Sequence, residues 1–95
     1  MDLVLGPNTV VGQTVDIRIR KFQGNLRVAG VGDVFELSDT AAFIFRKVNG
    51  SRTVEEISAE VANHYDAQPD EVRDDVRELL TELVKNKVLE VVVPG

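Results

Sequence analysis

The chain has 95 residues, no cysteine and a net charge of −5, with 43% hydrophobic and 28% charged residues. This composition is typical of one small globular domain, and it excludes a disulfide framework, a thiolate metal site and a chain that is disordered throughout. The N-terminal stretch has neither a basic start nor a long apolar run, and no segment is long and apolar enough for a membrane span. We therefore expect a soluble, cytoplasmic protein.

Three strands are predicted in the first third of the chain. Val15, Ile17 and Ile19 alternate with charged residues, a period of two that is typical of a strand with one buried face. Gly24 and Asn25 are expected to take positive φ in the hairpin that follows. The short connections indicate an antiparallel meander with at least one unpaired edge. The predicted strands are 15–20, 26–31 and 33–37.

Three helices are predicted after the strands. The first begins at Ser38 or Asp39, both good N-caps, and the second opens with a capping box made by Thr53 and Glu56. The third begins at Pro69 and runs to about residue 87, and a short strand or extended tail follows it. Residues at helical spacing predict the buried faces: Ala41, Ile44, Phe45 and Val48; Val54, Ile57, Val61 and Tyr65; Val72, Val76, Leu79 and Leu83.

The third helix carries a second line of residues at the same spacing, which is half basic and half apolar. Its members are Arg73, Arg77, Leu80 and Val84. In one interpretation this line is the wall of a groove, with an apolar floor and a charged lip. In the other, the apolar pair widens the core face while the arginines pair with acids along the helix, such as Asp70, Asp74 or Glu78. The sequence leaves both interpretations open.

No arrangement of residues in the sequence predicts catalysis. His64 is the only histidine, so a zinc site would need carboxylates for its other ligands, which zinc rarely uses. The serines have no histidine–acid pattern around them, and adjacent acids such as Asp74 and Asp75 point apart on a helix. We therefore predict a binding protein without catalytic residues, cofactor or metal.

Strands that lead into three helices predict an α+β, winged-helix-like domain, a fold in which many members read DNA. Between residues 53 and 86 there are ten acidic and three basic residues, so the predicted helices would be repelled by the phosphates of DNA. A DNA-binding regulator stays open as an alternative because the predicted strands carry a basic patch, and a dimerisation module stays open as another. An unpaired sheet edge also suits an extended peptide, which can add to it as a further strand. The basic patch is Arg18, Arg20, Lys21 and Arg27.

The order of these elements resembles the PqqD-like family, the recognition elements for ribosomally synthesised and post-translationally modified peptides (RiPPs). The resemblance covers roughly residues 15–90 and leaves 1–14 as a segment of unknown role. The residues that carry it are Leu37, Thr40, Ala41, Asn49, Gly50, Thr53, Val54, Glu56, Ile57, Tyr65, Val72, Val76, Leu80 and Leu83.

The resemblance implies a small domain that binds the leader region of a precursor peptide. The leader would add as a strand to the third strand, against the third helix, and be presented to a radical SAM enzyme, a cyclodehydratase or a leader peptidase. A homodimer is also compatible with the family. Carried over by position, the peptide-binding residues would be Asp33, Val34, Phe35 and Glu36 on the strand and Arg73, Val76, Arg77, Leu80 and Val84 on the helix.

Overall fold

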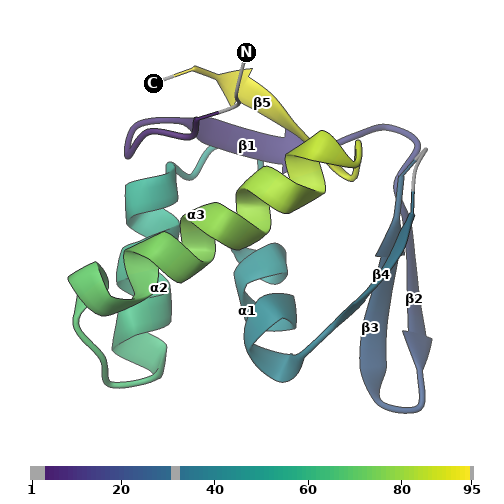
Figure 1. Ribbon diagram of the computed structural model, residues 1–95, viewed down its shortest axis with the longest axis horizontal. Helices are drawn as coiled ribbons and strands as arrows, with labels where there is room; N and C mark the ends of the chain where they lie inside the picture. The colour runs from purple at the N-terminus through teal and green to yellow at the C-terminus, as the bar shows by residue number, and fades with distance from the viewer. Residues whose placement is uncertain (1–3, 31–32, 95) are drawn as a thin grey trace.

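A three-stranded antiparallel sheet and three helices form the body of the fold, as the sequence predicts, and a second sheet of two strands joins the ends of the chain (Figure 1). The computed structural model describes residues 4–30 and 33–94. The elements are β1 Val10–Gln13, β2 Arg18–Phe22, β3 Asn25–Ala29, β4 Val34–Leu37, α1 Asp39–Lys47, α2 Val54–His64, α3 Pro69–Lys85 and β5 Leu89–Val93.

The three-stranded sheet has the order β2-β3-β4. A tight turn joins β2 to β3, with Gln23 and Gly24 at φ 51° and 85°, and Phe22 pairs with Asn25 across it. Positive φ at both turn residues matches the right-handed twist of the strands. The prediction that placed the turn at Gly24 and Asn25 was therefore wrong by one residue. Residues 31 and 32, at the end of the predicted second strand, lie outside the described residues.

The start of β2 also differs from the prediction. Residues before Arg18 form a turn, in which the Ile17 N–H donates to the Thr14 carbonyl at 3.3 Å. Val15, predicted on a buried face, is 96% exposed, and Ile19 is 45% exposed. β2 is exposed along its whole length because the helices cover the inner face of β3 and β4 instead.

The helix starts are confirmed. The Ser38 hydroxyl caps α1 by accepting from the Ala41 N–H at 3.2 Å. In α2, Thr53 Oγ1 accepts from the Glu56 N–H at 3.1 Å and Glu56 Oε1 accepts from the Thr53 N–H at 2.9 Å, so both halves of the capping box form. Tyr65, predicted on the buried face of α2, is 43% exposed instead.

Segment 1–14, predicted to lie outside the domain, is part of it wherever the structure describes it. Leu5 and Val11 are 1% and 0% exposed and belong to the hydrophobic core. β1 pairs antiparallel with β5, from Val10 opposite Val93 to Gln13 opposite Leu89. Residues 1–3 lie outside the described residues. The predicted boundary at residue 15 is therefore corrected, and β5 is a true strand.

The core lies between the inner face of β3 and β4, the three helices and the β1–β5 pair. β3 and the turn after α3 meet so closely that a Cβ at Gly30 would lie 2.2 Å from the Lys87 carbonyl oxygen, and only glycine fits there. Among the described residues, no helix is both long and apolar enough to cross a membrane.

Candidate functional site

β4 is an edge strand of the three-stranded sheet and pairs with β3 alone among the described strands. The register runs from Leu26 opposite Leu37 to Ala29 opposite Val34. Alternate residues of an edge strand direct their N–H and C=O groups away from the sheet, where another extended chain can pair with them. Within residues 4–30 and 33–94, no strand pairs with this edge of β4.

The side chains of β4 alternate between the core and solvent. Leu37 is buried and Phe35 is half-buried against the core, on the inner face. Val34 is 66% exposed and Glu36 is exposed, on the outer face. Glu36 is held in place by Asn25, whose amide donates to it at 2.6 Å. Asp33 directly precedes the strand and is exposed.

The structure does not contain the groove wall that was predicted on α3, because its apolar residues are part of the core. Val76 and Leu80 are 0% exposed and lie in the core, so neither side chain is available to a ligand. Val84 is half-buried and packs against the same core. The prediction of Leu80 and Val84 as a groove floor, and of Val76 as a peptide-binding residue, is therefore corrected. The alternative interpretation, in which Leu80 and Val84 widen the core face, holds. The helix needs the wider face because it packs on α2, α1 and β5 together.

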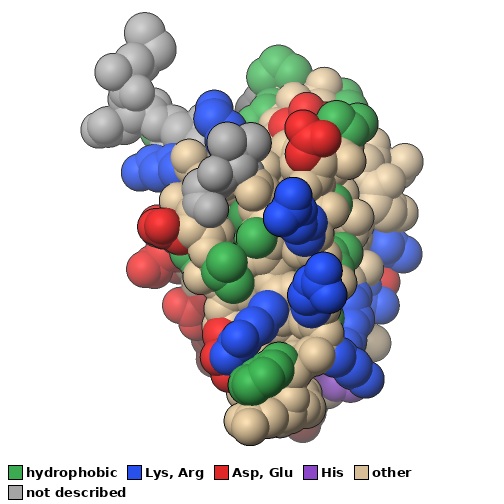
Figure 2. Space-filling model, turned by 90° about the vertical axis from the view of Figure 1, so that its right-hand side faces the viewer, with side chains coloured by type: hydrophobic (Ala, Val, Ile, Leu, Met, Phe, Trp, Pro, Cys, Tyr) green, Lys and Arg blue, Asp and Glu red, His purple; other side chains and the backbone are tan. Residues whose placement is uncertain are grey.

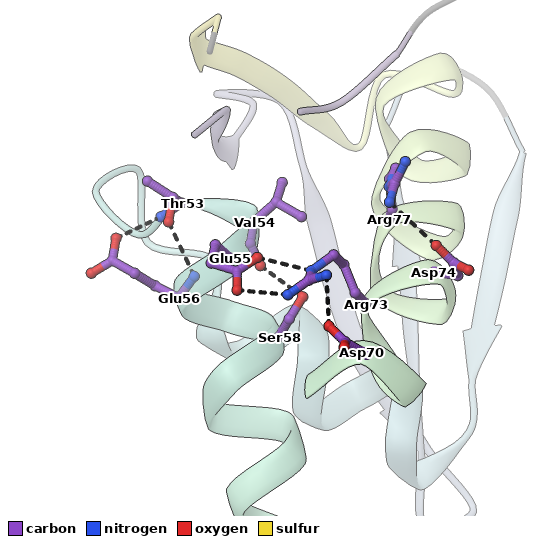
Figure 3. Close-up of polar contacts among 9 residues, drawn as sticks. All are labelled: Thr53, Val54, Glu55, Glu56, Ser58, Asp70, Arg73, Asp74 and Arg77. Carbon is purple, nitrogen blue, oxygen red and sulfur yellow. Dashed lines mark hydrogen bonds and ion pairs between the residues drawn. The ribbon is translucent and has the colours of Figure 1, made fainter. Parts of the chain in front are cut away.

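Arg73 and Arg77, the two arginines predicted on the groove wall, form ion pairs with nearby carboxylates. Arg73 donates to both carboxylate oxygens of Glu55 on α2, at 2.9 and 2.8 Å, and to Asp70 at 2.9 Å (Figure 3). The hydrogen bonds to Glu55 are the main cause of a raised pKa of the Arg73 guanidinium. Arg77 donates to Asp74 at 3.2 Å.

Both arginines lie on the flank of α3 that faces α2. They line a hollow of about 430 Å³ together with Pro7, Val54 and Glu55. None of these neighbours belongs to β4. The prediction that the arginines form the lip of a groove beside β4 is therefore corrected.

Figure 1 shows the three-stranded sheet on the far side of α1 from α2. By helical spacing, a second flank of α3 lies opposite Arg73 and Arg77 and faces away from α2. Its apolar residue is Leu79, which is half-buried and lines a shallow hollow of about 440 Å³. Asp75, Glu78 and Glu82 line the same hollow. Leu79 was predicted to lie in the core. Acids at the positions four before it and three after it in the sequence are the signal that it lies at the margin of the buried face.

His64 has a packing role. Its ring stacks on Phe43 at 4.1 Å between centroids, with Tyr65 edge-on to both rings. This cluster joins the end of α2 to α1. In the described part of the chain, no three His, Cys, Asp or Glu side chains gather as metal ligands would.

The sequence model of the family described as coenzyme PQQ synthesis protein D (PqqD) matches residues 4–89. The chain belongs to the PqqD family. The resemblance found in the sequence is thereby confirmed, and the match begins before β1, in agreement with the burial of Leu5 and Val11.

Solved structures share the fold of this PqqD-family chain. One is the solution structure of the PqqD truncation of Methylobacterium extorquens PqqCD, a functional and stand-alone RiPP recognition element, with a TM-score of 0.76 and 25% identity over 90% of this chain and 94% of that one. TbiB1 in complex with the TbiA(beta) leader peptide has a TM-score of 0.71 and 18% identity, over 83% of this chain and 94% of that one. Lasso peptide synthetase B1 complexed with the leader peptide has a TM-score of 0.71 and 17% identity, over 83% and 95%. A search of curated proteins found no match.

Proposed function

We propose that this PqqD-family chain binds the leader region of a ribosomally synthesised precursor peptide as an added strand at β4. It then presents the precursor to a modifying enzyme without catalysing a reaction itself. The observation that carries the proposal is the open edge of β4 in the described part of the chain. The fold it shares with a stand-alone recognition element and with two proteins solved with leader peptides supports it.

The strand side of the proposed site is Asp33, Val34, Phe35 and Glu36. Backbone pairing with β4 gives general affinity, and the side chains beside the added strand select the sequence. On α3 we propose Leu79 as the apolar contact, because it keeps an exposed part on the flank away from α2. Val76 and Leu80 are excluded by their burial.

The proposed mechanism is a gain in local concentration. A leader held on this domain keeps the core peptide near the modifying enzyme, so that modification becomes an encounter within one complex. We propose that this step takes place in the cytoplasm, where ribosomes would synthesise the precursor.

The proposal is tested by fluorescence polarisation with labelled leader peptides from precursor genes encoded beside this one. We expect saturable binding to one leader and at least a tenfold loss when a proline replaces a central residue of its paired segment, because proline cannot donate to the ladder. Arg46→Ala, on the exposed face of α1, is the control and should bind as wild type does. If a well-folded sample binds none of these leaders, or binds the proline peptide equally well, the proposal is wrong.

A further inference from the structure

The outer face of the three-stranded sheet, opposite the core, carries a shallow hollow of about 280 Å³. It is called the arginine hollow below. Figure 2 shows this side of the molecule, where Lys and Arg side chains gather with hydrophobic side chains between them. The hollow is lined by Arg18, Arg20, Arg27, Val28, Ala29 and Val34.

The strand register explains why all of these residues except Val28 share one face, since the Val28 side chain points to the core. Arg18 pairs with Ala29, and Ala29 pairs with Val34, so the three form a row across the sheet. The next row on the same face contains Arg20 and Arg27, with Glu36 beyond them on β4. The small side chain of Ala29 lies between longer neighbours and leaves the space that forms the hollow.

The three arginines differ in whether they already have a partner for their charge. Arg27 lies 3.5 Å from the Glu36 carboxylate and 4.0 Å from the centre of the Phe22 ring. Arg18 and Arg20 make no ion pair or side-chain hydrogen bond with any residue that the structure describes. They lie two residues apart on one face of β2, where like charges repel. A carboxylate placed between them would relieve this repulsion.

We infer that the arginine hollow binds an acidic residue of the leader, carried just outside the segment that pairs with β4. The inference rests on the proposed function. Val34 belongs both to the hollow and to the strand at which the leader adds. Strands lie about 4.8 Å apart, so a strand added to β4 lies three strand spacings, or about 14 Å, from β2. About five extended residues of the leader, leaving the paired segment beside Val34, would reach Arg18 and Arg20.

The chemistry selects an aspartate or glutamate whose neighbour is apolar. The carboxylate would accept from the two guanidinium groups, which suit carboxylates by geometry as well as by charge. The apolar neighbour would cover Val34 and Ala29. A nucleic acid fits less well, because the net charge of the chain is −5 and only two arginines of the hollow lack a partner in the described part.

The test is a double-mutant cycle on leader binding, measured by fluorescence polarisation. Arg18→Gln/Arg20→Gln should weaken a bound leader about three- to tenfold, the range expected for two exposed charge pairs. A leader in which the acids outside the paired segment become Asn or Gln should show the same loss, and the two changes together should cost little more than either alone. The difference should shrink at high salt.

Lys21→Gln is the matched control, because Lys21 is exposed on the same strand but on the other face. It should bind the leader as wild type does, and circular dichroism should show every variant folded. Equal binding by wild type and Arg18→Gln/Arg20→Gln would overturn the inference and leave the proposed function standing. A loss of affinity for random duplex DNA, with leader affinity kept, would make the hollow a phosphate site and overturn it too. Failure of wild type to bind any leader would overturn both.

Discussion

Leu79 and Leu80 are adjacent leucines with different environments. Leu80 is 0% exposed within the core, whereas Leu79 lies half-buried at the edge of a hollow lined by acids. Periodicity placed Leu79 on the core stripe and left Leu80 open between a groove and a wider core face. The structure buries Leu80 and leaves Leu79 at the margin of the core. One residue is a rotation of 100° on a helix, so the sequence could locate the buried face but not its margins.

We expect Leu80→Ala to lower the free energy of unfolding by about 2–5 kcal/mol, because it leaves a cavity in a closed core. Leu79→Ala should cost much less stability and should weaken leader binding. Urea unfolding measures the first effect and fluorescence polarisation the second. A Leu80→Ala protein with the wild-type unfolding midpoint, and unchanged leader affinity in Leu79→Ala, would contradict both assignments.

At the scale of whole elements, the helices could be predicted and the strand ends could not. Ser38, Thr53 and Pro69 predict the helix starts because capping and first-turn preferences depend only on neighbouring residues. All three predicted starts are confirmed. Strand ends depend on a partner that lies elsewhere in the chain. The alternation from Val15 to Ile19 therefore predicted a strand that begins too early, because the pairing of β2 with β3 begins only at Arg18.

The capping box of α2 should make stability depend on acid. Hydrogen bonds from the backbone and side chain of Thr53 lower the pKa of Glu56 from its usual value of 4.5. Its contribution to stability is therefore complete above that value and is lost as the pH falls through the lower, folded-state pKa. Glu56→Gln should be less stable than wild type near neutral pH, and the difference should disappear in strong acid.

Urea unfolding of both proteins at about pH 7 and about pH 3 measures this effect. Ser38→Ala is the control, because the Ser38 hydroxyl caps α1 without a carboxylate partner at Ala41. Its cost should be about 1 kcal/mol at either pH. A stability difference between Glu56→Gln and wild type that stayed constant across the range would refute the account.

At the scale of the molecule, the two ends of the chain complete the core together. Leu5 and Val11 contribute to it from one end and Leu89 from the other, and the Thr14 hydroxyl donates to the Lys87 carbonyl at 3.0 Å beside them. The hydrophobic residues around Val11 follow neither the alternation of a strand nor the spacing of a helix, so no local pattern predicts β1. Its burial follows from pairing with β5 at the far end of the sequence.

A matched pair of valines tests this closure. Val11 is 0% exposed and Val15 is 96% exposed. Val11→Ala should lower the free energy of unfolding by about 1.5–3 kcal/mol, since a fully buried valine side chain stabilises by that order. Val15→Ala should stay within about 0.5 kcal/mol of wild type. Equal unfolding midpoints in urea would mean that the N-terminal segment is not part of the cooperative unit.

The β1–β5 pair also determines how the domain can be attached to other proteins. Val10 and Val93 are cross-strand partners, so β1 begins beside the end of β5 in a small sheet that is separate from the sheet that contains β4 (Figure 1). The start of β1 and the end of β5 are therefore neighbouring positions in space. An enzyme linked before β1 or after β5 should therefore approach the domain from the same side, and either linkage should leave the edge of β4 open.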